Sequence, residues 1–119
     1  MKSECLDGDT IHAHGHTYRL VDFDAPETDR ARCEAERVLG QRASHRLRHL
    51  VDTGGLDLHE IRCSCPEGTH GTQACNYGRR CGTLKAHGRD AGMILIGEGL
   101  ARSYHCGATR CPARKSWCQ

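Results

Sequence analysis

Nine cysteines in a chain of 119 residues are the feature that most limits how this sequence can fold. Leu, Ile, Val and Phe together supply only 18 residues, about 15% of the chain, which is too few for a large apolar core. Disorder also requires a high net charge, and the formal net charge here is only +2. We therefore expect one small domain that is held together by disulfides, by a metal, or by both.

The cysteine content also bears on the compartment, because disulfides persist in oxidising surroundings. It favours a secreted or periplasmic protein, although the first ten residues, MKSECLDGDT, contain no apolar stretch of the kind that a signal peptide needs. No apolar run approaches the ~18 residues of a transmembrane helix, so we expect no contact with a membrane. We expect a monomer.

The order of apolar and turn residues predicts the secondary structure. Strands are expected in the first 24 residues, with a turn at His14-Gly15. The segment TDR after Pro26 is expected to open a helix, and apolar residues recur every four positions from about 32 to 51. Strands follow at 56–62 and 79–86, and then a short helix capped by Asp90.

This order is three strands, a helix, two strands and a helix. So few antiparallel strands cannot cover both faces of a sheet, so a small barrel with helices packed on it fits best. We therefore expect an α+β, mainly β, fold: a five-stranded OB-fold barrel with a long helix after strand 3 and a short helix after strand 5. Residues 1–104 would form this domain, and residues 105–119 a Cys-rich tail packed on it.

Acidic residues and arginines form a second pattern, in DGDT at 7–10, YRL at 18–20, DAPET at 24–28 and YGR at 77–79. Crowded carboxylates are tolerated when a cation, a proton or an arginine sits among them. Calcium prefers carboxylate and carbonyl oxygens, and arginine matches the oxygens of a phosphate. Together these groups could cleave a phosphodiester, with a carboxylate orienting or deprotonating water.

In these motifs, and in EGLA at 98–101, the chain resembles the staphylococcal nuclease (thermonuclease) family over roughly residues 5–104. Cys33 and Trp117-Cys118 place it nearer to the Cys-rich bacterial thermonuclease-like proteins. The resemblance implies an OB-fold nuclease that uses Ca²⁺ to cut the 5′ P–O bond of DNA and RNA, leaving 3′-phosphates.

The resemblance also implies a role for individual residues. The carboxylates of Asp9 and Asp24 would bind Ca²⁺ together with the backbone carbonyl of Ala25, where the staphylococcal enzyme has threonine. Glu27 would orient or deprotonate the attacking water. Two neighbouring acids are expected to lie outside this set: Asp22 as a solvated strand residue, and Asp7 as a turn residue beside the metal.

The basic and aromatic residues complete the implied site. Arg19 and Arg79 would hold the phosphate and stabilise the transition state, and Tyr77 would line the nucleotide site. A non-catalytic OB-fold nucleic-acid-binding module is the alternative, with DNA or RNA as the partner in either case. A degenerate module is expected to lack some of the five charged site residues, and all five are present in this chain.

The remaining cysteines allow more than one arrangement. Cys63, Cys65, Cys75 and Cys81 follow the spacing C-x-C-x9-C-x5-C, which could form a structural Zn²⁺ site or two disulfides. Spacing alone does not fix the connectivity. We predict two disulfides among these four cysteines, one between Cys106 and Cys111, and one between Cys33 and Cys118 that ties the tail to the first helix. Cys5 is then left over, and Trp117 is expected to anchor the tail.

Overall fold

The computed structural model describes residues 4–118, and the side chains from Asp7 onward. The elements before the long helix are β1 (Glu4–Asp7), β2 (Thr10–Ala13), β3 (His16–Leu20) and β4 (Asp22–Asp24). The later elements are α1 (Glu34–Asp52), β5 (Leu56–Ile61), η1 (Asn76–Gly78), β6 (Arg80–Ala86), β7 (Arg89–Asp90), α2 (Ala91–Gly97) and β8 (Arg102–Tyr104). The prediction of a mixed fold with a multi-stranded sheet and two helices is confirmed.

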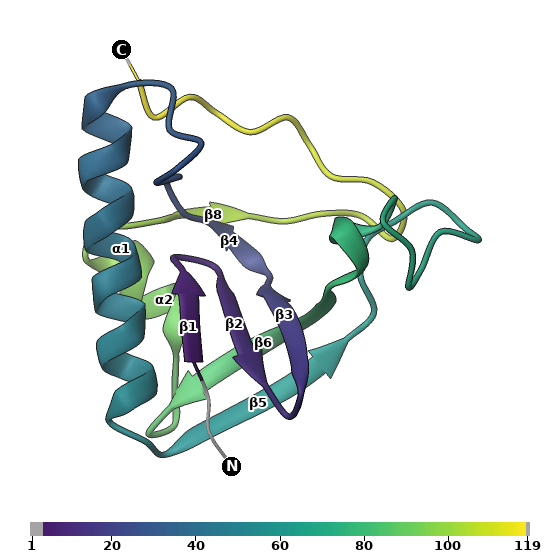
Figure 1. Cartoon of the computed structure of the whole chain (residues 1–119), viewed down its shortest axis with the longest axis horizontal. Coiled ribbons are helices and arrows are strands. Elements are labelled where there is room, and N and C mark those ends of the chain that lie inside the picture. The colour runs from purple at the N-terminus through teal and green to yellow at the C-terminus, as the bar shows by residue number, and fades with distance from the viewer. Residues whose placement is uncertain (1–3, 119) are drawn as a thin grey trace.

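The main sheet has the strand order β1-β2-β3-β6-β5, and β7 pairs with β6. The meander β1-β2-β3 is antiparallel, β3 runs parallel to β6, and β6 is antiparallel to β5. Strands β4 and β8 form a separate two-stranded sheet. Figure 1 shows the helix α1 along one side of the molecule, beside β1.

The predicted barrel is not closed among the described residues. β1 and β5 are the two ends of the strand order, and no pairing between them joins the sheet into a ring. The run TYRLVDF at 17–23, within the stretch expected to form strands, is also divided: Val21 lies between β3 and β4, and Asp22, the first residue of β4, adopts a positive φ of 75°. Strand β8, which pairs with β4, was not predicted, since three residues are too short to show an alternating pattern.

The long helix begins later than the TDR segment that was expected to open it. Cys33 is the N-cap of α1, and its sulfur accepts a hydrogen bond from the backbone N–H of Glu36. The buried carboxylate of Glu36 in turn accepts hydrogen bonds from the backbone N–H groups of Glu27 and Arg32. The side chain of Glu36 therefore supplies acceptors for backbone N–H groups that precede the helix. With these donors satisfied, residues 25–33 follow an irregular path and do not form a helical turn.

The apolar core lies between α1, α2 and the sheets. Its fully buried large side chains include Ile11, Leu20, Leu47 and Leu95. The short helix α2 is capped as predicted, with the carboxylate of Asp90 accepting a hydrogen bond from the N–H of Met93 over 2.9 Å. In the described part of the chain, neither helix is long and apolar enough to cross a membrane.

The expectation of disulfides is confirmed. Four are formed in the part of the chain whose side chains are described: Cys33–Cys118, Cys63–Cys81, Cys65–Cys75 and Cys106–Cys111. Cys63, Cys65, Cys75 and Cys81 could have bound zinc or formed disulfides, and they form two of these bonds. They also make up a second buried cluster, separate from the main core. Cys5 lies in β1.

Residues 105–118 contain no helix or strand, yet they are held at several points. The guanidinium of Arg102 donates to the backbone carbonyls of Lys115 and Ser116 and lies 3.7 Å from the centroid of the Trp117 ring. The hydroxyl of Tyr104 donates to the carbonyl of Pro112. In Figure 1 this yellow segment runs along the upper edge of the molecule and ends beside the start of α1, where Cys118 is bonded to Cys33.

Candidate active site

A cavity of about 510 Å³ gathers most of the residues that the sequence picked out. Five of them line it: Asp9, Arg19, Glu27, Tyr77 and Arg79. Arg114, a tail residue that the sequence did not assign to the site, lines it as well. These residues come from the first hairpin, the segment before α1, the disulfide-bonded loop and the tail, so only the folded chain brings them together.

Asp9 is placed by the tight connection between β1 and β2. Its N–H donates over 3.1 Å to Oδ1 of Asp7, which is the last residue of β1 rather than part of the turn itself. A Cβ on Gly8 would lie 3.0 Å from the Cβ of Ala25, so glycine lets this turn approach the segment that follows β4. The carboxylate of Asp9 accepts a hydrogen bond from the hydroxyl of Thr10.

The surroundings of Asp9 favour its protonated form. Burial of the carboxyl group, the hydrogen bond with Asp7 and the charge of Asp7 raise its pKa from 3.8 to about 7. The guanidinium of Arg19, whose Nε lies 3.8 Å from Oδ2 of Asp9, acts in the opposite direction but does not outweigh burial. A cation that bound here would favour the ionised carboxylate.

Arg19 lies on β3, between β2 and β6, and its side chain is largely buried. Its Nη1 donates to the side-chain oxygen of Asn76 over 3.4 Å. Burial lowers the pKa of Arg19 from its ordinary value, and the nearby Asp9 charge partly offsets this. Its Nε is buried without a hydrogen-bond acceptor among the described residues.

Tyr77 and Arg79 are presented by the turn η1, which the two loop disulfides flank. Tyr77 has a positive φ of 57° and an exposed side chain, so its ring stands at the rim of the cavity. The guanidinium carbons of Arg30 and Arg79 each lie 5.7 Å from the centroid of this ring. Arg79 donates from Nη1 to the Thr10 hydroxyl over 3.0 Å and from Nε to the Asn76 carbonyl over 2.8 Å.

Asp24 and Ala25 are buried and do not line this cavity. They line a neighbouring one of about 230 Å³, together with Glu27, Arg114 and Trp117. Oδ2 of Asp24 accepts a hydrogen bond from Nε1 of Trp117 over 3.3 Å, so the indole anchors the tail at the candidate site. Asp22, by contrast, is exposed, and its carboxylate lies 3.5 Å from Nδ1 of His105.

Glu27 is held by the start of α1. Its N–H donates to Glu36, and the helix backbone passes very close to it at Gly40. A Cβ on Gly40 would lie 2.3 Å from the carbonyl oxygen of Glu27, so only glycine fits at this position without displacing the Glu27 backbone. The backbone of Glu27, from which this carboxylate extends, is therefore held in place by the helix.

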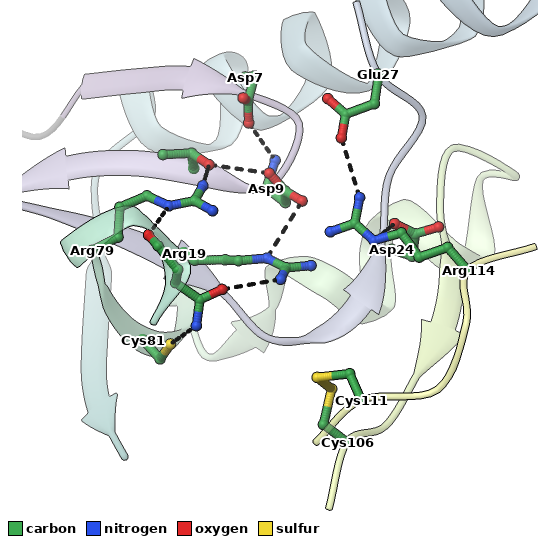
Figure 2. A network of polar contacts seen from close by, with 12 residues as sticks. Asp7, Asp9, Arg19, Asp24, Glu27, Arg79, Cys81, Cys106, Cys111 and Arg114 are labelled. Atoms are coloured by element: carbon green, nitrogen blue, oxygen red, sulfur yellow. Dashed lines mark hydrogen bonds and ion pairs between the residues drawn. A yellow bond between two sulfur atoms is a disulfide. The ribbon is translucent and has the colours of Figure 1, made fainter. Parts of the chain in front are cut away.

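Arg114 lies between the carboxylates of Asp24 and Glu27, as Figure 2 shows. Its Nε is 3.4 Å from Oδ1 of Asp24, and its Nη1 donates to Oε1 of Glu27 over 3.1 Å. Burial works against the charge of Arg114, but the carboxylates of Asp24, Asp9 and Glu27 prevail and raise its pKa above the ordinary value. Arg114 is thus a permanent positive charge among the crowded acids.

The residues that could hold a divalent cation supply suitable oxygen donors, because calcium prefers carboxylates and backbone carbonyls. Oδ1 of Asp24 is also buried and has no hydrogen-bond donor within residues 4–118, and a cation would satisfy this oxygen. As they stand, however, no three His, Cys, Asp or Glu side chains of the described residues gather closely enough to hold a metal. The donor types fit Ca²⁺, whereas the space beside Asp24 is taken by Arg114.

Comparison with known proteins leaves the function to be inferred from this geometry. A scan against protein-family models found no match, and a search of curated protein sequences found none either.

Sequence reasoning missed three contributors to the site. Asn76 connects the arginines, through its side-chain oxygen to Arg19 and through its carbonyl to Arg79. Glu36 fixes the backbone of Glu27. Arg114 lies in a tail that has no periodicity, so no local pattern placed it at the site; its proximity to Trp117-Cys118, which were expected to anchor the tail, is a signal that pointed there.

Proposed function

We propose that this chain is a nuclease of the thermonuclease type that hydrolyses phosphodiester bonds of DNA and RNA with Ca²⁺ as cofactor. The expected reaction cuts the 5′ P–O bond and leaves a 3′-phosphate. One observation carries the proposal: Arg19 and Arg79 line the same cavity as Asp9 and Glu27, although these residues come from three separate segments of the chain.

The two arginines supply the positive charge that such a reaction needs. Both are held by Asn76, and Arg79 also contacts Thr10. A guanidinium can donate two parallel hydrogen bonds to the oxygens of a phosphate, and its charge favours the more negative transition state. Because the arginines are positioned before substrate binds, little reorganisation is needed when that charge develops.

The carboxylates supply the groups that act on water and metal. Glu27 would orient the attacking water and accept its proton. Asp9, Asp24 and the carbonyl of Ala25 would hold Ca²⁺, which when bound neutralises charge on the phosphate as a Lewis acid. Tyr77, exposed at the rim, would stack against a nucleobase, since an aromatic ring accepts any base.

The strand arrangement supports membership of the OB-fold class. An antiparallel three-stranded meander, β1-β2-β3, is followed by the long helix α1 and then by the pair β5 and β6, with β6 packed beside β3. This is the order expected for a five-stranded OB barrel with a helix after its third strand. The proposed barrel would be open between β1 and β5.

A non-catalytic nucleic-acid-binding module is the second candidate. One observation favours it: the acids of the site are each beside a guanidinium, Asp9 next to Arg19, and Asp24 and Glu27 next to Arg114. A site whose acids are neutralised in this way can still bind a phosphate backbone. Such a module would bind nucleic acid in the presence of EDTA and leave it intact.

Digestion of a supercoiled plasmid and of a single-stranded RNA in Ca²⁺, Mg²⁺ or EDTA separates the two candidates. The nuclease proposal predicts cleavage of both polymers in Ca²⁺ and none in EDTA. Binding in a gel-shift assay without cleavage under any condition would instead support the module.

A further inference from the structure

The tail places a guanidinium where a bound cation would be needed. Arg114 contacts two acids that belong to different parts of the proposed site: Asp24, a proposed metal ligand, and Glu27, the proposed acceptor of the water proton. Figure 2 shows its guanidinium group between these carboxylates. An arginine does not lose its proton in proteins, so this positive charge is present at every working pH.

A guanidinium and a divalent cation cannot share this position. Two positive charges within contact distance of the same carboxylate repel each other, and the buried setting of Asp24 strengthens that repulsion. Glu27 is affected too, because a carboxylate paired with an arginine is a poorer acceptor for the proton of water. With Arg114 in place, the proposed site is therefore unable to take up its metal.

The contact is also one that can be broken. The Arg114 side chain is 39% exposed, so it can move into solvent without crossing the core. Its distance of 3.4 Å to Asp24 makes an ion pair, yet Oδ1 of Asp24 still has no hydrogen-bond donor among the described residues. A metal ion would satisfy this buried oxygen better than Arg114 does.

A covalent tether keeps Arg114 near the acids. Cys118, four positions further along the tail, is bonded to Cys33 at the start of α1. Trp117, which lies between Arg114 and Cys118 in the sequence, donates a hydrogen bond to Asp24 and stacks on Arg102. A tethered group has a high effective concentration at its target, so the disulfide strengthens the hold of Arg114 on the site.

We infer that Arg114 and Ca²⁺ compete for Asp24, so that the disulfide-tethered tail opposes the binding of Ca²⁺ to the site. This inference rests on the proposed function, whose cation site it concerns. Ca²⁺ binds fully only when the tail moves Arg114 away, so its apparent affinity is the intrinsic affinity multiplied by the fraction of molecules in which Arg114 is away from the acids.

Isothermal titration of the full, EDTA-treated chain with CaCl₂ tests the competition without relying on catalysis. The variants are Arg114→Gln and the double variant Cys33→Ser with Cys118→Ser; serine is itself a good N-cap, so α1 keeps its first-turn hydrogen bond. Arg110→Gln is the matched control. It removes the same charge from the same tail, and Arg110 is exposed and forms no ion pair among the described residues.

The competition predicts that Arg114→Gln binds Ca²⁺ at least ~10-fold more tightly than the wild type. The double cysteine variant should shift in the same direction by a smaller factor, and Arg110→Gln should match the wild type. A thermal melt of each variant confirms that it is folded at the titration temperature.

Equal or weaker Ca²⁺ binding by Arg114→Gln would overturn the inference, as would the absence of Ca²⁺ binding in every variant. The result is separable from that of the proposed function. Tighter binding with no hydrolysis by any variant would support the competition and count against the nuclease. Hydrolysis that persists in EDTA, with no gain in Ca²⁺ affinity, would overturn the competition and leave phosphodiester cleavage standing.

Discussion

Nη1 of Arg79 donates a hydrogen bond over 3.0 Å to the hydroxyl of Thr10, whose own hydrogen is donated to the carboxylate of Asp9. This chain of contacts joins the disulfide-bonded loop to the first hairpin. Asn76 adds a second connection through Arg19. Neither arginine is therefore a free surface charge, and each can be expected to hold a fixed direction toward the cavity.

Replacing either arginine by lysine tests the need for this geometry. We expect Arg19→Lys and Arg79→Lys each to lower kcat at least ~10²-fold, because an ammonium group cannot reproduce two parallel hydrogen bonds to a phosphate. Arg80→Lys is the matched control, since Arg80 is exposed and paired with Glu60. Steady-state cleavage of an oligonucleotide gives kcat, and near-wild-type values for both variants would place these arginines outside the site.

The close approach of α1 to Glu27 gives a second prediction. Alanine is the better helix former by about 1 kcal/mol, yet at position 40 its Cβ would meet backbone atoms of Glu27 and Pro26. Gly40→Ala should therefore displace Glu27, which should lower kcat and leave KM nearly unchanged. Gly97→Ala, in α2 with open space around its Cβ, should leave cleavage unchanged. Equal kinetics for the two variants would show that the helix does not position Glu27.

Local patterns in the sequence were sufficient for much of the fold. The four-residue repeat of Ala35, Leu39, Ala43 and Leu47 identified α1, and Asp90 marked the start of α2. The barrel could not be decided in the same way. Closure depends on whether β1 and β5 pair, and that pairing would join residues about fifty positions apart, which no local pattern reports.

The site, like the fold, could be predicted only where local motifs report it. Motifs of three to five residues singled out Asp9, Arg19, Glu27, Tyr77 and Arg79, which line one cavity. They could not show that Asp24 faces Arg114 and Trp117, because those contacts join residues at opposite ends of the chain. The N-terminal limit of α1 was also missed, since it depends on the side chain of Glu36 turning back to residues 27 and 32.

The raised pKa of Asp9 predicts how stability depends on pH in the metal-free protein. The folded state binds this proton more tightly than the unfolded state, whose pKa is close to 3.8. The stabilisation is therefore complete below about pH 4 and is lost as pH rises to about 7, on the order of a few kcal/mol. Asp9→Asn should flatten the profile over this range, measured by urea unfolding in EDTA at pH 4.5, 6 and 8.

Asp24→Asn provides the comparison for that experiment. Crowding alone would predict that removing either acid stabilises the metal-free protein, but Asp24 is a partner of both Trp117 and Arg114. We expect Asp24→Asn to lower the free energy of unfolding at pH 8, where Asp9→Asn raises it. An unchanged pH profile in Asp9→Asn would show that Asp9 ionises normally in the folded chain.

The loop disulfides should matter for both stability and activity. Cys65–Cys75 closes a loop with a sequence separation of 10, which corresponds to about 3 kcal/mol in the chain-entropy model. Cys65→Ser with Cys75→Ser should lower the Tm and reduce kcat, because the bond flanks the turn that carries Tyr77 and Arg79.

Opening the Cys106–Cys111 loop in the same way provides the control, and it should affect kcat less. Non-reducing peptide mapping with thiol counting checks the bonds themselves. Four thiolates at positions 63, 65, 75 and 81 that are protected only while zinc is bound would favour the metal alternative.

Cleavage of one end-labelled DNA oligonucleotide, with and without Ca²⁺, tests the proposed activity most directly. The wild type should produce fragments with 3′-phosphate ends in Ca²⁺ and none in excess EDTA, and Glu27→Gln should lower the rate at least ~10²-fold because the amide cannot take up the water proton as the proposal requires of Glu27. An intact oligonucleotide after prolonged incubation of folded wild-type protein with Ca²⁺ would contradict the nuclease proposal.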